Sequence, residues 1–118
     1  MEEFNILVCD DDKSIVDAIE IYLKQEGYNV IKAYNGLEAL QALEENEIHL
    51  ILLDIMMPQM DGVETLHHIR KKIGTYYQNV PIIALTANAV AGNREKLLKE
   101  GFDDFLEKPI ERSVLERV

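Results

Sequence analysis

The stretch FNILVCDDD, residues 4–12, decides the fold class of this 118-residue chain. It begins with apolar, β-rich residues from Phe4 to Val8 and ends in three consecutive aspartates, Asp10 to Asp12. After it, apolar side chains recur at helical spacing from Ile15 to Leu23 and stop before Gly27. The stretch therefore predicts a strand, an acidic turn and a helix, in that order.

The same alternation continues along the rest of the chain. Further strands are predicted at residues 28–34, 48–53, 80–85 and 102–107, and further helices begin near residues 37, 61, 90 and 110. The run from Ile48 to Leu53 is almost wholly apolar, as expected of a strand that is buried on both faces of a parallel sheet. Strand–helix units in this order predict one α/β domain over residues 1–118, with helices on both faces of the sheet.

The composition limits the classes of function. The chain carries 22 acidic and 12 basic residues, a formal charge of −10, so we expect no direct nucleic-acid partner. Cys9 is the single cysteine, which excludes an internal disulfide. No apolar run approaches the roughly 18 residues of a membrane span, and no charged-then-apolar leader follows Met1. We therefore expect a cytoplasmic protein without membrane insertion.

Polar side chains follow the predicted strands at one edge of the sheet. Asp10 to Asp12 follow the first strand, Asp54 the third, Thr86 the fourth and Lys108 the fifth. Ligands of such sheets bind beyond the carboxyl ends of the strands. Clustered carboxylates repel by on the order of 4 kcal/mol per pair at about 4 Å, and a hard cation such as Mg²⁺ offsets that repulsion. The pattern predicts a Mg²⁺-dependent phosphoryl-transfer site, where Thr86 and Lys108 contact phosphoryl oxygens.

Each of these residues alone has a simpler structural interpretation. An aspartate after a strand often only caps a helix, and Asp12, nearest the next helix, fits that role best. A lone lysine such as Lys108 is more often solvated, and a strand-end hydroxyl such as that of Thr86 more often bonds the backbone. Cys9 is interpreted as a small buried hydrophobe. The convergence of the aspartates, Thr86 and Lys108 on one edge of the sheet is what favours phosphoryl transfer.

Four motifs together resemble the receiver domain of two-component response regulators. They are ILVCDDD at residues 6–12, LLDIMMPQMDG at 52–62, IIALTA at 82–87 and Lys108-Pro109. The resemblance covers the whole chain and implies a doubly wound, flavodoxin-like five-stranded sheet of order 2-1-3-4-5 with five helices. It also implies that Asp54 accepts a phosphoryl group from a histidine of a sensor kinase or phosphotransfer domain. The chain would be a self-catalysing phosphoacceptor and not a turnover enzyme.

The resemblance also implies roles for single residues. The groups that would hold Mg²⁺ are all oxygen donors: Asp10, Asp11, Asp54 and the backbone carbonyl of Met56. Asp11 would bind the metal directly and Asp10 mainly through water. Thr86 and Lys108 would contact the phosphoryl group on Asp54.

Two further functions, switching and dephosphorylation, follow from the same resemblance. Phe105 would turn inward when Thr86 moves toward phosphorylated Asp54, and the face of the fourth helix, fifth strand and fifth helix would change with it. That face is also a candidate surface for a homodimer. Met56 and Asn88 stand where side chains guide or block the hydrolytic water, and neither is an acid or base. We therefore expect slow self-dephosphorylation, in minutes to hours.

The sequence leaves the output of the domain open. The part up to Gly62 resembles regulators with a DNA-binding output, whereas residues 82–110 resemble receivers attached to hybrid sensor kinases. A start at Met1 favours an N-terminal or stand-alone receiver.

Two other functions are alternatives. One is a phosphatase of the haloacid dehalogenase type, with Asp10 as nucleophile, Asp12 as acid and Asp103-Asp104 as a later motif, although this pair precedes Lys108 where that class has it after the lysine. The other is a binding module that does not depend on phosphorylation. Substitution of Asp54 distinguishes the phosphatase from the receiver.

Overall fold

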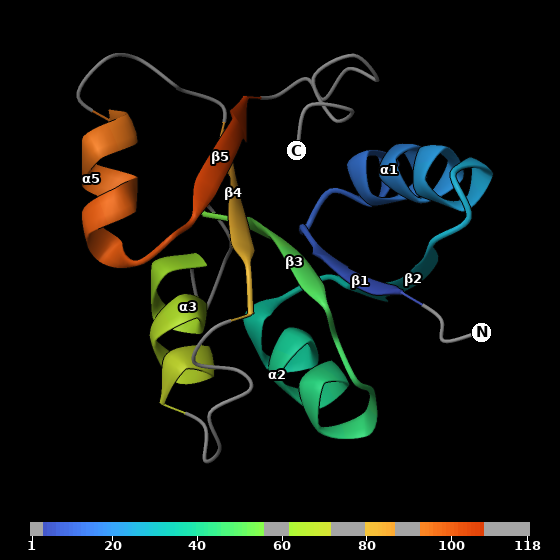
Figure 1. The fold of residues 1–118 in the computed structure, drawn as a ribbon, viewed down its shortest axis with the longest axis horizontal. Helices are drawn as coiled ribbons and strands as arrows, with labels where there is room; N and C mark the ends of the chain where they lie inside the picture. Colours follow the sequence, from blue (N-terminus) through green and yellow to red (C-terminus); the bar gives the residue numbers. More distant parts are fainter. Residues whose placement is uncertain (1–3, 56–61, 72–79, 87–92, 108–118) are drawn as a thin grey trace.

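The computed structural model of the protein describes residues 4–55, 62–71, 80–86 and 93–107 (Figure 1). The elements in these ranges alternate between strand and helix: β1 (Asn5–Cys9), α1 (Lys13–Gln25), β2 (Asn29–Ala33), α2 (Gly36–Glu45), β3 (Leu50–Asp54), α3 (Gly62–Arg70), β4 (Ile82–Thr86), α5 (Asn93–Glu100) and β5 (Asp104–Glu107). The predicted alternation is confirmed over these ranges. The predicted helix near residue 110 lies outside the described residues.

The strands form one five-stranded parallel sheet of order β2-β1-β3-β4-β5. Cys9 at the end of β1 pairs with Ala33 of β2 on one side and with Leu53 of β3 on the other. Thr86 at the end of β4 pairs with Glu107 of β5. The order 2-1-3-4-5 expected from the family resemblance is thereby confirmed, and it brings the carboxyl ends of β1, β3 and β4 side by side.

Helices cover both faces of the sheet (Figure 1). On one face, three residues of α1, Val16, Ile19 and Leu23, pack with sheet side chains. On the other face, α2 and α3 contribute a second apolar cluster, which includes Leu43 and Leu66. The alternation of strand side chains between these clusters leaves β3 buried on both faces, as its apolar run predicts.

Local side-chain chemistry sets the ends of the helices. The Asp12 side chain accepts a hydrogen bond of 2.9 Å from Ser14 N and caps α1, as predicted. Gly27 and Gly101, which follow α1 and α5, have φ of 92° and 116°, a backbone region that favours glycine. No helix in the described ranges is long and apolar enough to span a membrane.

Candidate functional site

Three acidic side chains meet at the carboxyl edge of the sheet. Asp10 and Asp11 follow β1, and Asp54 is the last residue of β3, the neighbouring strand. One carboxylate oxygen from each lies within 4.8 Å of the others. Asp10 and Asp54 are 0 % and 1 % exposed, whereas Asp11 is exposed. The structure thus brings together three of the four carboxylates that the sequence places at this edge, and one of the three, Asp11, is exposed.

The turn after β1 gives its consecutive aspartates different environments. The Asp10 backbone N–H donates to Ala33 O at 3.2 Å, which continues the pairing with β2 beyond the strand. Asp10 Oδ1 accepts a hydrogen bond of 2.9 Å from Asp12 N. The Asp12 carboxylate is turned toward α1 as its cap, and it does not belong to the group formed by Asp10, Asp11 and Asp54.

The pKa of the Cys9 thiol is affected by the negative charge at this edge of the sheet. Its thiol is buried and its Sγ donates to Asn35 O at 3.4 Å. Burial raises the pKa of the Cys9 thiol, and the nearby charges of Asp10 and Asp54 raise it further. These causes disfavour a thiolate, which fits the interpretation of Cys9 as a packing residue.

Thr86 ends β4, the strand on the other side of β3, and is 3 % exposed. Ala84, two residues earlier on β4, belongs to the cluster under α2 and α3, so Thr86 shares that face of the sheet by alternation. Phe105 on β5 pairs with Ala84 and packs partly buried against the same cluster. The residues expected to form the switch therefore lie on adjacent strands and on one face.

Three of the predicted site residues, Met56, Asn88 and Lys108, lie outside the described residues, and their roles stay predictions. Sequence reasoning also missed a contact at this edge. The ammonium of Lys13 lies over the ring of Tyr34, 5.5 Å from its centroid. Nothing in the local sequence links these two residues, because the contact depends on the pairing of β1 with β2.

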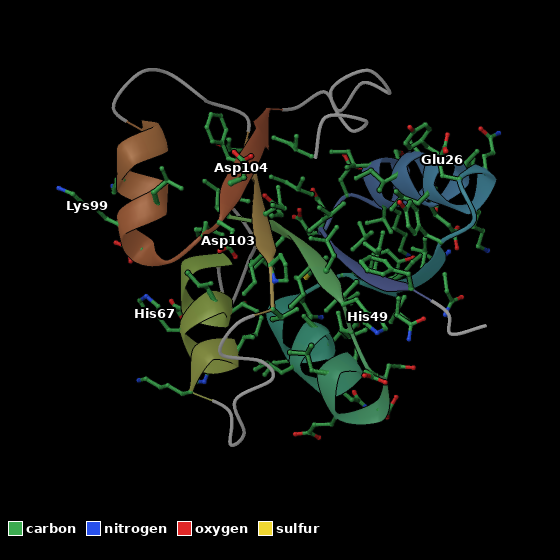
Figure 2. All side chains as sticks on the ribbon, viewed as in Figure 1. Glu26, His49, His67, Lys99, Asp103 and Asp104 are labelled. Carbon is green, nitrogen blue, oxygen red and sulfur yellow. The ribbon has the colours of Figure 1, made fainter. Side chains whose placement is uncertain are left out.

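The aspartates Asp103 and Asp104 lie at the other edge of the sheet. Ile82 N, at the start of β4, donates to Asp103 Oδ2 at 2.8 Å, and Asp103 N donates to Ile82 O at 2.9 Å. Asp103 is labelled between the end of α5 and β5 in Figure 2. Since all strands are parallel, this end of β4 is opposite to Thr86. The phosphatase alternative, which needs these aspartates near Asp10, is therefore wrong in its residue assignment.

The donors of the acidic group suit a hard divalent cation. All three are carboxylates, two are buried, and their charges repel one another when no cation is near. Oxygen donors of this kind are the ligands that Mg²⁺ prefers, usually with water and a phosphate group completing its shell. Asp10, Asp11 and Asp54 therefore form a set that can bind Mg²⁺.

Comparisons with known proteins agree with this geometry. The chain is 40 % identical over 112 residues to the uncharacterized transcriptional regulatory protein YrkP of Bacillus subtilis, covering 95 % of this chain and 46 % of YrkP. It thus spans about half the length of that curated relative.

Solved structures give the same result. Chemotaxis protein CheY4 of Vibrio cholerae superposes with a TM-score of 0.89 at 28 % identity, over 98 % of this chain and 95 % of that one. A second structure is the receiver domain of sensor histidine kinase PA1611 of Pseudomonas aeruginosa, which has a magnesium ion coordinated in its active site cleft. It superposes with a TM-score of 0.85 at 36 % identity, over 98 % of this chain and 93 % of that one. The sequence model of the response regulator receiver domain matches residues 6–118, and the chain belongs to that family.

Proposed function

We propose that residues 1–118 act as one receiver domain in which Asp54 accepts a phosphoryl group in a Mg²⁺-dependent reaction. The observation that carries this proposal is the convergence of Asp10, Asp11 and Asp54 within 4.8 Å at the carboxyl edge. Two of these carboxylates are buried and one faces solvent, which suits a site that admits a small phosphodonor.

Different residues would form the new bond and position the phosphoryl group during the transfer. An oxygen of Asp54 forms a bond to phosphorus while the bond from phosphorus to the donor breaks, and the donor leaves with the bonding electron pair. The Thr86 hydroxyl and the Lys108 ammonium hold phosphoryl oxygens in line with Asp54. The chain is altered by the transfer, so it is a phosphoacceptor that catalyses its own modification and not a turnover enzyme.

Asp10, Asp11, Asp54 and the Met56 carbonyl would hold Mg²⁺. When bound, the metal would neutralise the carboxylates and stabilise charge on the phosphoryl oxygens. The magnesium ion in the PA1611 receiver supports this assignment. A histidine of a sensor kinase or phosphotransfer domain, acting in the cytoplasm, would be the natural donor.

The slow hydrolysis expected from Met56 and Asn88 is part of this proposal. A Met56→Asn/Asn88→Glu double variant gives the water a polar guide and a base, so it should release phosphate faster than wild type, by roughly 10²-fold if the full effect of a positioned base is gained. A double variant that releases phosphate no faster than wild type would show that Met56 and Asn88 do not control the lifetime of the phosphorylated state.

The test of the reaction is labelling with acetyl phosphate, followed by intact mass. We expect wild type to gain one phosphoryl group with Mg²⁺ and none with a chelator, and Asp54→Asn to gain none. Asp12→Asn is the matched control, because it removes the same charge at a residue that caps α1. Labelling of Asp54→Asn to the wild-type level would overturn the proposal.

A further inference from the structure

Lys13 is a cation beside an acidic site that it does not enter. It is the first residue of α1 and follows Asp10, Asp11 and Asp12 directly. Its Nζ lies 5.5 Å from the centroid of the Tyr34 ring, within the range of a cation–π contact. No ion pair of Lys13 occurs among the residues that the structure describes.

The order of the strands puts Tyr34 and Asp54 on opposite sides of β1. Cys9 of β1 pairs with Ala33, the residue before Tyr34, and also with Leu53, the residue before Asp54. A side chain at the start of α1, which follows the end of β1, can therefore turn toward β2 or toward β3. The contact with Tyr34 holds the Lys13 ammonium on the β2 side, away from Asp54.

Tyr34 is a fixed platform for this contact. Its ring is half-buried and packs against the apolar cluster under α1. Its backbone N–H donates to Glu38 Oε1 at 2.9 Å, and Glu38 N in turn donates to the Asn35 cap of α2 at 2.8 Å. Lys13, by contrast, is exposed and has a long flexible stem. The ring thus restrains the more mobile partner.

An ammonium released from this ring would find strong competing partners. The Asp11 carboxylate is exposed two residues away, and Asp10 and Asp54 lie beside it. A lysine that paired with these acids would occupy oxygens needed for a divalent cation and would repel that cation.

We propose that Tyr34 is a positioning residue that holds the Lys13 ammonium on the β2 side of the edge and so keeps the three carboxylates open to Mg²⁺. The inference rests on the proposed function, since it concerns the metal affinity of the same site. It makes Lys13 and Tyr34 a pair whose effect on Mg²⁺ binding is coupled.

The test is a double-mutant cycle read out by Mg²⁺ titration in a calorimeter at low ionic strength. We expect Tyr34→Leu to weaken Mg²⁺ binding about two- to fivefold, the range that an exposed cation–π contact supports. Tyr34→Phe keeps the ring and should bind as wild type does. In a Lys13→Met background, Tyr34→Leu should cause no further loss, because no ammonium remains to be released.

A metal-free measurement checks the contact itself. The ε-methylene protons of Lys13 should show an upfield ring-current shift by NMR in wild type and Tyr34→Phe, and the shift should vanish in Tyr34→Leu. Tyr34→Phe keeps the ring and removes only the hydroxyl, so the comparison with Tyr34→Leu isolates the ring.

Equal weakening by Tyr34→Leu in both backgrounds would overturn the inference, since damage to the fold acts whether or not Lys13 is present. An unaltered Mg²⁺ affinity in Tyr34→Leu would overturn it as well. Either result leaves the proposed function standing, whereas a wild-type chain that binds no Mg²⁺ would remove both.

Discussion

The Asp12 backbone N–H donates a hydrogen bond of 2.9 Å to Asp10 Oδ1, although the carboxylates of the two residues serve different structures. Asp10 is buried and lies with Asp11 and Asp54, while Asp12 caps α1 through Ser14 N. The bond fixes the turn between strand and helix and orients one oxygen of a site carboxylate. Substitutions of Asp11 and Asp12 therefore change the charge equally, but we expect them to affect different properties, Mg²⁺ binding for Asp11 and the stability of α1 for Asp12.

Asp12→Ala should lower the free energy of unfolding by about 1 kcal/mol, the usual cost of losing an N-cap side chain. The substitution removes the acceptor of Ser14 N at the start of α1. Urea denaturation followed by circular dichroism measures the effect. Asp12→Asn keeps an acceptor oxygen and should lose much less, so equal losses in the two variants would contradict the capping role.

Asp11→Asn should abolish Mg²⁺ binding at millimolar metal and raise the melting temperature in chelator. It removes one of three charges that lie within 4.8 Å, and the gain should be on the order of 1 kcal/mol because Asp11 is exposed and screened by solvent. Thermal unfolding with chelator and with Mg²⁺ tests both parts. Asp12→Asn controls for the overall change in charge, and an Asp11→Asn variant that melts below wild type in chelator would refute the repulsion.

The sheet could be predicted because its information is local to each strand. The apolar run of β3 and the polar residues at the strand ends indicate a parallel sheet, and the family resemblance that the four motifs carry implies the order of its strands. The ends of the strands are harder to predict from the sequence. Residues 102–107 read as one strand, yet β5 begins at Asp104, since Phe102 is 3 % exposed in the core and Asp103 bonds Ile82. Apolar character alone does not distinguish a buried loop residue from a strand.

The site could be predicted only as far as its chemistry lies at strand ends. Asp10, Asp11 and Asp54 come together because β1 and β3 are neighbours, which the family resemblance implies. The contact between Lys13 and Tyr34 depends on side-chain directions at two turns, and no spacing rule encodes these directions.

Cys9 should resist thiol reagents in the folded protein at neutral and mildly alkaline pH. It is buried, and burial together with the charges of Asp10 and Asp54 raises its pKa, so little thiolate forms. Labelling with iodoacetamide followed by mass spectrometry should be slow in buffer and rapid in urea. Added Mg²⁺ should slow it further, because binding to the folded state makes opening rarer. Rapid labelling of the folded chain would contradict the buried, anionic surroundings.

Beryllofluoride, a phosphoryl mimic, should shift amide resonances of the predicted switch face as Thr86 moves toward Asp54 and Phe105 turns inward. This face comprises α5, which is the fourth helix expected from the sequence, β5, and the last helix, predicted near residue 110. The hydroxyl is expected to carry this movement, so Thr86→Val should lose the shifts near Phe105 while Thr86→Ser retains them. Two-dimensional NMR of the three proteins with Mg²⁺ and beryllofluoride measures the difference. Shifts confined to α1 and α2 would refute the switch.

Because of Glu20, the free energy of unfolding should depend on pH in the acid range. Hydrogen bonds from Lys32, at 3.1 Å, and from Lys24 lower the pKa of the Glu20 carboxyl below its usual 4.5. A lowered pKa in the folded state stabilises the fold above the unfolded value, and this contribution is lost as the pH falls through the folded value. Lys32, whose own pKa is raised by Glu20, stays charged throughout this range.

Glu20→Gln should therefore lower the urea midpoint modestly near neutral pH, and the difference from wild type should disappear once the pH falls below the lowered pKa of Glu20 in the folded state. High salt should shrink the effect at neutral pH, because all the partners are close to solvent. Asp17→Asn, which removes a longer contact of 3.7 Å to the same Lys32, is the matched control and should change the midpoint less. A Glu20→Gln deficit that persists unchanged at acid pH would mean that packing of the side chain, and not its charge, joins α1 to β2.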